Sequence, residues 1–462
     1  AEASKISANN LSDIVKVMAS DEFEGRAPGT VGEDKTVAYL IAQMKKIGLT
    51  PGGTEGSWTQ AVPMMRSEVK PSAKMSFSSV DRVLTLAQGT SVSVDTATAR
   101  TSIVATDVPV VFVGFGANAP EQDWDDYGGI DLTGKLAIYL VNDPDFAAEP
   151  QEAVAGRFGN RRMTYYGRWT YKFEEAARRG AFGALVIHET EAAGYDWSVA
   201  AAGAGENVSL ANKDPQALPV TLQGWLHNDA ARELLAAAGH DLDALRNTAR
   251  QPEFQAFELE GMLFEADLEV DITTFDSQNV LGLLPGNERP EEVIMASAHW
   301  DAYGIGAPDE QGRTVRAGAN DDALGSAGIL ELARVIKAQP AMARSVLFAF
   351  WTAEEAGLVG SMAYAADPIF PIEKTVANFT LDILQTAGAA NDVILVGKGQ
   401  SELEDSLARV AEVAGRYVTE ENLPENGLFY RADHFSMARV GVPVLLMMGI
   451  AGGADLVVGG RE

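Results

Sequence analysis

Apolar residues recur at helical spacing in two stretches near the start of the chain. The spacing predicts one helix over residues 11–19 and a second, amphipathic helix over residues 33–47. One face of the second helix is apolar and carries Val37, Leu40, Ile41 and Met44. Gly48 follows, and glycine commonly ends helices because it adopts the left-handed conformation easily. We therefore expect two helices joined by a polar loop.

The last part of the chain, residues 256–462, alternates between short apolar runs and helical patterns. The predicted strands cover residues 293–298, 344–351, 379–383, 393–396 and 442–447, and the predicted helices cover residues 323–337 and 403–414. Apolar strands separated by helices are typical of a mostly parallel sheet with helices on both faces. The expected fold class is therefore α/β, with a mixed, mostly parallel sheet flanked by helices.

The middle of the chain has a different pattern, in which strand-like runs alternate with long loops rich in Gly, Ala and Asp. Strands are predicted over residues 108–113, 136–141, 184–187 and 218–221, a helix over 172–179, and a loop over 200–204. This pattern indicates a separate α+β module. The chain is thus expected to divide into residues 1–105 and 256–462, which form one domain, and an insertion over residues 106–255.

Composition narrows the class of protein. The chain has 462 residues, which is more than one ordinary domain contains. Its 36 basic and 65 acidic side chains give a net charge of −29, which argues against binding to nucleic acid. The absence of Cys excludes disulfides and thiol catalysis, so any metal site must use His, Asp and Glu. No apolar run reaches the length of a membrane span.

The start of the chain, Ala1-Glu2-Ala3, resembles that of a mature protein after removal of a signal peptide. We therefore expect export, either by secretion or to the periplasm.

Acidic residues and His follow successive predicted strands. These groups are His299-Trp300-Asp301, Asp321-Asp322, Glu354-Glu355, Asp382 and Asp433-His434. Ligands of α/β sheets gather beyond the carboxyl ends of the strands. Taken alone, an Asp-Asp pair before a helix is usually a cap and a Glu-Glu pair is usually solvated. Their recurrence at consecutive strand ends predicts a metal site instead.

Zinc chemistry accounts for these residue types. Zinc accepts imidazole and carboxylate ligands, and two ions about 3.5–4 Å apart need a bridging carboxylate. Asp321 lies between the other groups along the chain and is the expected bridge, with His299 as a ligand and Asp301 as the group that orients the His299 ring. In the pair Glu354-Glu355, one carboxylate is expected to bind metal and the other to take a proton from water.

These motifs together resemble those of the co-catalytic zinc aminopeptidase family. The matching segments are Phe23-Glu24-Gly25-Arg26, Ser297-Ala298-His299-Trp300-Asp301, Gly318-Ala319-Asn320-Asp321-Asp322, Ala353-Glu354-Glu355-Ala356-Gly357, Leu381-Asp382 and Ala432-Asp433-His434-Phe435. The resemblance implies the zinc exopeptidase fold with an inserted domain similar to protease-associated domains. It also implies two Zn²⁺ ions, peptide substrates, and a cis peptide bond between Asp321 and Asp322.

The resemblance also implies the role of each site residue. His299, Asp321, Glu355 and Asp382 would bind zinc, Glu354 would be the general base, and Asp301, Asp322 and His434 would support them. The family has a fifth ligand, a His downstream of the Asp-His-Phe motif. This chain has five His, at 188, 227, 240, 299 and 434, and none follows His434. Either that ligand lies beyond Glu462, or the second ion is held weakly, with His434 as a ligand by default.

The sequence leaves several activities open. An aminopeptidase is expected, with Tyr430 as a candidate donor to the oxyanion. If Arg431 binds the terminal carboxylate of a substrate, a carboxypeptidase or dipeptidase is expected instead. A glutaminyl cyclase-like transferase and a metal-poor, receptor-like binding protein are the remaining alternatives. The sequence does not indicate the oligomeric state.

Overall fold

The computed structural model describes residues 5–211, 219–450 and 452–461. Ala1-Glu2-Ala3, on which the expectation of export rests, and Leu218, at the start of one predicted strand, lie outside the described residues. The chain forms two compact units. The first comprises Ala1–Met64, Phe275–Leu423 and Leu428–Glu462, and the second comprises Met65–Thr274 and Pro424–Gly427.

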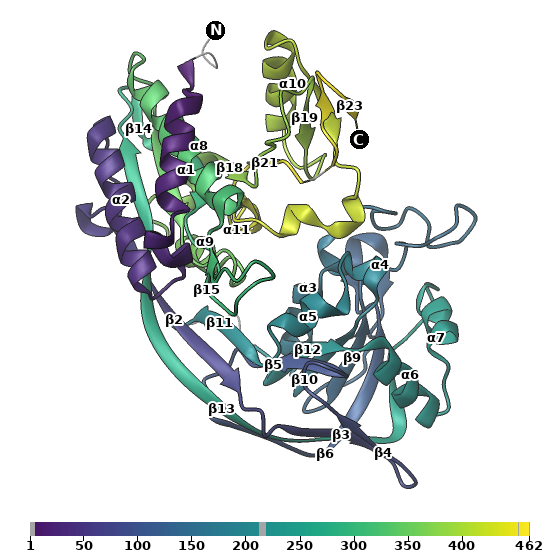
Figure 1. Ribbon diagram of the computed structural model, residues 1–462. Coiled ribbons are helices and arrows are strands. Elements are labelled where there is room, and N and C mark those ends of the chain that lie inside the picture. The colour runs from purple at the N-terminus through teal and green to yellow at the C-terminus, as the bar shows by residue number, and fades with distance from the viewer. Residues whose placement is uncertain (1–4, 212–218, 451, 462) are drawn as a thin grey trace. The chain divides into compact units, whose positions relative to one another are not determined.

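The first unit is built on a mostly parallel sheet. Its strand order is β21 (Val444–Met448), β18 (Thr375–Asp382), β14 (Arg289–His299), β17 (Arg344–Trp351) and the last part of β13 (Phe257–Leu284). The first four strands are parallel to their neighbours in this order, and β13 is antiparallel to β17. Figure 1 shows β13 as the longest strand of the chain. The predicted α/β fold is confirmed.

Alternate residues of these strands are buried on opposite faces of the sheet. In β17, Phe348 and Phe350 pack with one apolar cluster, whereas Leu347, Ala349 and Trp351 pack with another. Side chains of a strand alternate between the two faces, so a strand that is apolar throughout needs cover on both. Helices supply that cover.

The helices that cover the sheet begin and end near their predicted bounds. The first cluster takes its helical residues from α1 (Ala8–Met18), α2 (Val31–Ile47) and α8 (Leu324–Lys337). Figure 1 shows α1 and α8 side by side. Gly48 ends α2 with φ 89°, as expected for a glycine cap. The second cluster includes α9 (Val359–Ala366) and α11 (His434–Arg439), two short helices that the sequence pattern did not predict.

One predicted strand lies outside the main sheet. The strand expected over residues 393–396 is β19 (Asp392–Leu395), and it pairs in parallel with β20 (Tyr417–Glu420) in a separate two-stranded sheet. Helix α10 (Leu403–Val413) connects these two strands. Two further short strands, β22 (Asp455–Leu456) and β23 (Gly460–Arg461), pair with each other nearby in sequence.

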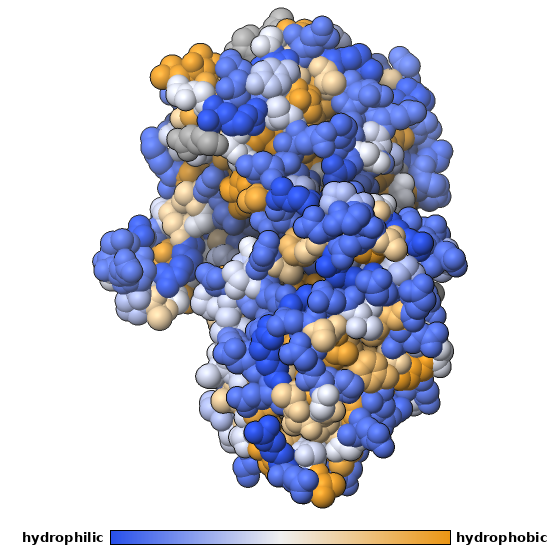
Figure 2. All heavy atoms as spheres, turned by 90° about the vertical axis from the view of Figure 1, so that its right-hand side faces the viewer, coloured by the Kyte–Doolittle hydropathy of each residue, from blue (hydrophilic) through white to orange (hydrophobic). Residues whose placement is uncertain are grey.

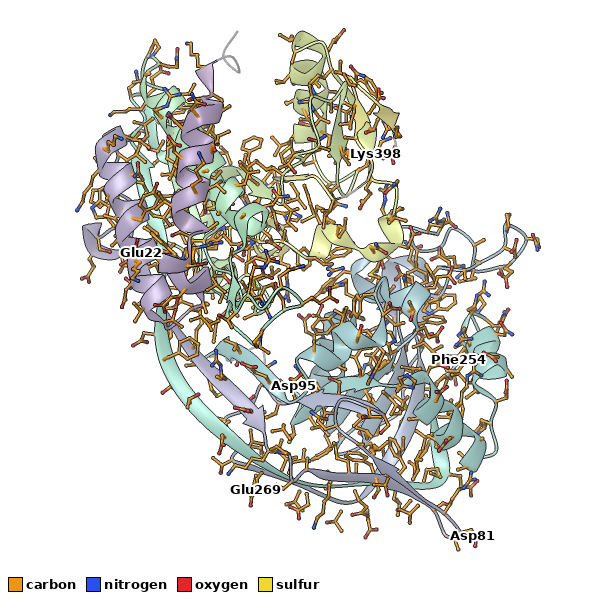
Figure 3. The ribbon with its side chains drawn as sticks, in the orientation of Figure 1. Glu22, Asp81, Asp95, Phe254, Glu269 and Lys398 are labelled. Atoms are coloured by element: carbon orange, nitrogen blue, oxygen red, sulfur yellow. The ribbon has the colours of Figure 1, made fainter. Side chains whose placement is uncertain are left out.

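The second unit contains its own sheet. Its strand order is the first part of β13, then β6 (Ser102–Gly114), β9 (Leu136–Leu140), β10 (Gly183–Ile187), β12 (Leu222–Leu226) and β5 (Val92–Asp95). The four strands from β6 to β12 are parallel, and the two edge pairings are antiparallel. A hairpin of β3 (Lys74–Ser78) and β4 (Val83–Leu86) also pairs with β13, and Asp81 lies in its turn (Figure 3).

Helices α3 (Trp169–Arg178), α6 (Asn228–Ala237) and α7 (Leu242–Ala249) pack on this second sheet.

Two predictions of local structure in the second unit are wrong. The sequence predicts a strand over residues 218–221, but the strand that forms here, β12, starts at Leu222. The apolar run continues past the predicted end. The stretch 200–204 is not all loop, because Ala200 to Ala202 form the end of helix α5 (Trp197–Ala202). Alanine favours helices, so a run of small residues does not by itself indicate a loop.

The second unit is wider than the segment 106–255 that the sequence pattern predicts. It also takes in β3, β4, β5 and the first part of β13, and the chain crosses between the units within two strands, β2 (Thr59–Val69) and β13. The pattern of apolar and polar residues in a strand does not change where the strand passes from one compact unit into the other. A prediction from this pattern therefore places the domain boundary at the next loop. The likeness of this unit to a protease-associated domain stays a prediction.

The visible surface is mostly polar. Figure 2 shows a face on which hydrophilic residues dominate and apolar residues occur in small groups. Within residues 5–211, 219–450 and 452–461, no helix has the length and hydrophobicity that crossing a bilayer requires.

A buried arginine joins four segments of the first unit. Arg26 is fully buried, and its guanidinium donates to the carbonyl oxygens of Trp300 (2.8 Å) and Met18, Ala317 and Gly318 (2.7 Å each). The preceding Gly25 has φ 67°, and a Cβ there would lie 2.5 Å from the carbonyl oxygen of Gly304, so only glycine fits. Arg26 thereby connects the N-terminal segment to the loops that follow β14.

We expect the substitution Arg26→Met to lower the free energy of unfolding of the first unit by at least about 3 kcal/mol, because it leaves buried carbonyl groups without donors. Urea denaturation followed by tryptophan fluorescence measures this. Arg313→Met is the matched control, because that guanidinium pairs with Asp309 in a turn where 71% of the Arg side chain is exposed, and there we expect little change. Equal losses for both variants would contradict the role of Arg26.

Candidate metal centre

His299 is the last residue of β14 and is held on both sides of its ring. Its Nε2 atom lies 3.0 Å from Oδ1 of Asp321, and its Nδ1 atom lies 3.4 Å from Oδ1 and 3.2 Å from the carbonyl oxygen of Asp301. The hydroxyl of Ser326 in α8 donates to the carbonyl oxygen of His299 at 2.9 Å. With the ring so enclosed, Nε2 is directed at Asp321, and Nδ1 faces Asp301 as the sequence predicts.

Three of the predicted ligands converge. His299, Asp321 and Asp382 each offer one donor atom, and these atoms lie within 4.8 Å of one another. His299 ends β14, Asp382 ends β18, and Asp321 lies in the turn Ala319–Ala323 that leads into α8. Strands β14 and β18 are parallel neighbours, so their carboxyl ends meet at the same edge of the sheet. The fold therefore assembles this group from residues far apart in the sequence.

Asp301 connects the ends of two strands. It is 1% exposed, and its carboxylate accepts hydrogen bonds from the backbone amides of Glu354 (3.1 Å) and Glu355 (3.3 Å), which follow β17. The same carboxylate faces Nδ1 of His299, the last residue of β14. Asp301 thus places the two glutamates relative to the His299 ring.

The two glutamates differ in their surroundings. The side chain of Glu354 is 10% exposed, and its Oε2 atom lies 3.9 Å from Nε2 of His299. Glu355, a predicted ligand, lies outside the group of His299, Asp321 and Asp382. Burial and the charge of Asp321 raise the pKa of its carboxylate, and the neighbouring hydroxyl of Tyr303 lowers it. Glu354 is thus the glutamate nearer to His299.

Asp322 supports the site through the backbone. Its Oδ2 atom accepts from the amide of His299 (3.3 Å) and its Oδ1 atom from the amide of Gly325 (2.9 Å). Asp322 is fully buried, and the Asp321–Asp322 peptide bond is cis, as the family resemblance implies. The position of Asp322 beneath the end of β14 agrees with the supporting role that the resemblance implies.

The carboxylates of the site have raised pKa values. Burial raises the pKa of Glu354 well above its ordinary value, and the charges of Asp382, Asp433 and Glu355 add to this. Burial and Asp321 raise the pKa of Glu355 to about 8, and burial raises that of Asp382 to about 6. Although burial opposes the charged imidazolium, hydrogen bonds to Asp301 and Asp321 raise the pKa of His299 well above its ordinary value. The site therefore has a surplus of negative charge.

Carboxylate oxygens in the site lack hydrogen-bond partners. Among the described residues, Oε1 of Glu355, Oδ1 of Asp382 and Oδ1 of Asp433 are buried and unpaired. A buried polar atom without a partner is costly, and such atoms commonly belong to an ion or water site. One imidazole and several carboxylates suit zinc better than magnesium, which prefers oxygen ligands alone. The donor set fits zinc.

His434, Tyr430 and Arg431 lie outside the group of three converging ligands. His434 is fully buried at the start of α11, its ring lies 4.8 Å from that of Phe429, and it lies outside the group of His299, Asp321 and Asp382. Burial lowers the pKa of His434 to about 3, so its ring stays neutral. Tyr430 packs against the rings of Phe429 and Phe435. Arg431 is exposed, and its charge acts on Asp382.

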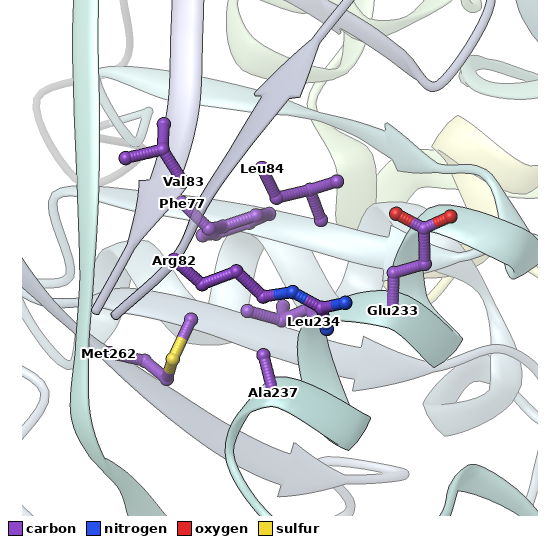
Figure 4. Close-up of a pocket in the computed structure, with 8 residues that line it drawn as sticks. All are labelled: Phe77, Arg82, Val83, Leu84, Glu233, Leu234, Ala237 and Met262. Carbon is purple, nitrogen blue, oxygen red and sulfur yellow. The ribbon is translucent and has the colours of Figure 1, made fainter. Parts of the chain in front are cut away.

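The remaining histidines belong to the second unit. His188 packs against Trp225 (5.5 Å between ring centres), His227 against Trp197 (5.0 Å) and His240 against Phe257 (5.1 Å). The second unit also has a hollow of about 380 Å³, including space open to solvent (Figure 4). Its walls are mainly apolar, and Arg82 and Glu233 are its charged lining residues. This lining offers no set of metal ligands.

Sequence reasoning missed two residues of the site. Arg26 lies in a segment that resembles the family, but no role for it was predicted, and its charge acts on Asp301 and Asp322. Tyr303 follows Asp301 by two residues and reaches Glu355. A lone tyrosine in a loop carries no pattern that distinguishes it, so only its spacing from Asp301 hinted at a role.

Comparisons with known proteins agree with this geometry. Residues 279–455 match the family described as Peptidase family M28. Aminopeptidase YwaD of Bacillus subtilis (strain 168) is 32% identical over 127 residues, which are 27% of this chain and 25% of that protein. Leupeptin-inactivating enzyme 1 of Streptomyces exfoliatus is 28% identical over 204 residues, which are 43% of this chain and 42% of that protein. The matches thus span less than half of either relative.

Among solved structures, an aminopeptidase from Aneurinibacillus sp. strain AM-1 has the same fold. Its TM-score to this protein is 0.51 at 20% sequence identity, and the alignment covers 96% of this chain and 85% of that chain. At this identity the likeness establishes the fold, a mostly parallel sheet flanked by helices, and it extends over both units of the chain.

We expect zinc binding to weaken as the pH falls. In the metal-free fold, the pKa of Asp382 is raised to about 6 and that of Glu355 to about 8. The protonated groups therefore favour folding below about pH 4. This contribution to stability is lost as the pH rises through about 6 for Asp382 and about 8 for Glu355. Zinc needs the carboxylates, so binding must release protons, and below pH 6 its affinity should fall by at least about tenfold per pH unit. Calorimetric titration between pH 5.5 and 8 measures this. An affinity independent of pH would contradict the assignment.

Proposed function

Because residues 279–455 match Peptidase family M28, we propose that the protein is a zinc-dependent aminopeptidase that removes N-terminal residues from peptides. One observation carries the proposal: His299, Asp321 and Asp382 present donor atoms within 4.8 Å of one another, and Glu354 lies 3.9 Å from His299. A metal site beside a buried carboxylate is the arrangement that metal-assisted hydrolysis requires.

We further propose two zinc ions. The first takes His299, Asp321 and Asp382 as its ligands. The side chain of Asp321 is 39% exposed, and its charge adds to the effect of burial in raising the pKa of the nearby Glu355 carboxylate. A second ion would be held by these two carboxylates and would relieve their mutual repulsion. When bound, zinc acidifies a coordinated water and polarises the carbonyl group of the scissile bond.

Glu354 is the proposed general base. Burial raises its pKa well above the ordinary value of a glutamate, which makes the carboxylate a stronger base. Its backbone amide is fixed by Asp301, so the carboxylate is placed next to His299 and not in solvent. Glu354 takes the proton of the attacking water and delivers it to the amine that leaves.

The choice of an aminopeptidase rests on charge and on the relatives. A free α-amino group is positive and is attracted to a site rich in carboxylates, and the net charge of −29 draws such substrates to the protein. Several relatives, among them the Bacillus protein, are named as aminopeptidases. Arg431 is exposed and close enough to act on Asp382, so recognition of a substrate carboxylate is the alternative that an assay must exclude.

The variant Glu354→Gln tests the proposal. It keeps the size of the side chain but removes the base, so we expect hydrolysis of leucine p-nitroanilide to fall by about 10²–10⁴-fold while zinc content stays unchanged. Metal analysis and steady-state kinetics measure both quantities. Glu412→Gln on the exposed surface of α10 is the matched control and should hydrolyse the substrate at the parent rate.

Substrate controls separate the remaining activities. An N-acetylated substrate should resist hydrolysis, and removal of zinc by a chelator should abolish activity until zinc is restored. Release of C-terminal residues would indicate a carboxypeptidase, and cyclisation of an N-terminal Gln peptide would indicate a transferase. Bound zinc without turnover of any of these substrates would overturn the proposed function.

A further inference from the structure

The two glutamates of the metal centre lie in a short loop between β17 and α9. The two ends of this loop meet where the backbone amide of Gly360 donates to the carbonyl oxygen of Thr352 at 3.0 Å. Within the loop, Ala353 and Leu358 have φ angles of 51° and 64°. This left-handed backbone costs free energy at residues other than glycine, so the loop keeps its shape only where surrounding contacts enforce it.

Asn279 of β13 joins the two ends of the loop through its side chain. Its Oδ1 atom accepts from the backbone amide of Thr352 (3.2 Å), and its Nδ2 atom donates to the carbonyl oxygen of Gly360 (2.8 Å). A carboxamide presents an acceptor and a donor side by side, as these two backbone groups require. Asn279 is fully buried, so its hydrogen bonds are shielded from water. Its side chain thus fixes the distance between the loop ends.

The neighbours of Asn279 hold the carboxamide in this orientation. Its Nδ2 atom also donates to Oε1 of Gln60 in β2 at 3.1 Å. The Nε2 atom of Gln60 in turn donates to the carbonyl oxygen of Asp367 at the end of α9 (2.8 Å). Gly360 leaves the room that the carboxamide needs, because a Cβ there would lie 2.5 Å from Oδ1 of Asn279. The position of Asn279 is therefore determined by β2, by α9 and by the loop itself.

The loop is held at a second place by Asp301, which accepts the backbone amide of Glu354 at 3.1 Å. Only Ala353 separates Glu354 from Thr352, whose amide Asn279 binds. A shift of this loop end is therefore passed on to Glu354 through a single residue. The carboxylate of Glu354 keeps its place in the site only if both attachments are present.

We propose that Asn279 is a positioning residue that sets the place of the Glu354 carboxylate during proton transfer. This inference rests on the proposed function, because it requires Glu354 to be the general base. The hydrogen bonds of the Asn279 side chain go to the loop ends and to Gln60, so Asn279 acts through the loop and not on the substrate. The three converging metal ligands come from other segments, so loss of Asn279 affects the base and spares the first zinc ion.

Steady-state hydrolysis of leucine p-nitroanilide by the zinc-saturated full chain tests the inference. We expect kcat of Asn279→Ala to fall by about 10–100-fold while KM changes by less than about threefold, because a catalytic group displaced by about 1 Å loses rate on this scale. Metal analysis should find the same zinc content in the variant and the parent.

A double-mutant cycle with Glu354→Gln separates positioning from a general effect on the fold. Once the carboxylate is gone, Asn279→Ala has nothing further to displace. The kcat of the double variant should therefore equal that of Glu354→Gln within about twofold. A merely structural role of Asn279 would lower kcat by the same factor in both backgrounds.

Asn142→Ala is the matched control. Asn142 is also fully buried, and its Nδ2 atom also donates to two oxygens, the carbonyl oxygens of Ala192 (2.9 Å) and Glu425 (3.4 Å), but it lies in the second unit. We expect Asn142→Ala to unfold at a lower urea concentration than the parent and to keep the parent kcat.

If Asn279→Ala does not fold, Asn279→Asp takes its place, because it has the same size and keeps an oxygen for the Thr352 amide. It lacks the donor to Gly360, so we expect the same fall in kcat. A parent kcat in the Asn279 variant, or an equal loss in both backgrounds, would overturn the inference and leave the proposed function intact. A parent protein that neither binds zinc nor hydrolyses any peptide overturns the proposed function, and the inference with it.

Discussion

The carboxylate of Asp301 is the interaction on which the site depends. It faces Nδ1 of His299 at the end of β14 and accepts the amides of Glu354 and Glu355 after β17, so one buried side chain couples the two strand ends that carry the imidazole and both glutamates. Backbone amides are rigid donors, so the distance between imidazole and glutamates is set by the sheet register and by this one residue. The geometry is therefore built before any substrate or ion arrives.

A surplus of buried negative charge follows from this arrangement. The carboxylates of Glu354, Glu355, Asp382 and Asp433 have raised pKa values, and some of their oxygens have no donor within the described chain. The buried charge of Arg26 lies near, but its hydrogen bonds go to backbone carbonyls and not to these carboxylates. A site that is strained in this way when metal-free is poised to gain stability from a divalent cation, which connects the packing of the fold to its proposed chemistry.

Much of the site was predictable because local chemistry and strand position coincide. His299 and Asp382 each end a strand of the parallel sheet, and parallel strands bring their carboxyl ends together whatever the rest of the fold does. Tyr303 and Arg26 were not predictable in the same way. Each acts through contacts with residues distant in sequence, and neither a loop tyrosine nor a single arginine changes a hydrophobic pattern. The loop predicted over residues 200–204 was wrong for a related reason, because small residues are compatible with more than one local structure, and part of this stretch belongs to α5.

The sequence by itself determined the class of fold, the acidic and cysteine-free character of the protein, and the residue types able to hold a metal, since these follow from composition and from periodicity within one segment. Only the tertiary structure decided which of those residues bring their donor atoms together. His299, Asp321 and Asp382 meet, whereas Glu355 lies outside this group and His434 is buried against Phe429. The physical reason is that side-chain direction at a strand end depends on the hydrogen bonds and packing of neighbouring strands, which no single stretch of the chain contains.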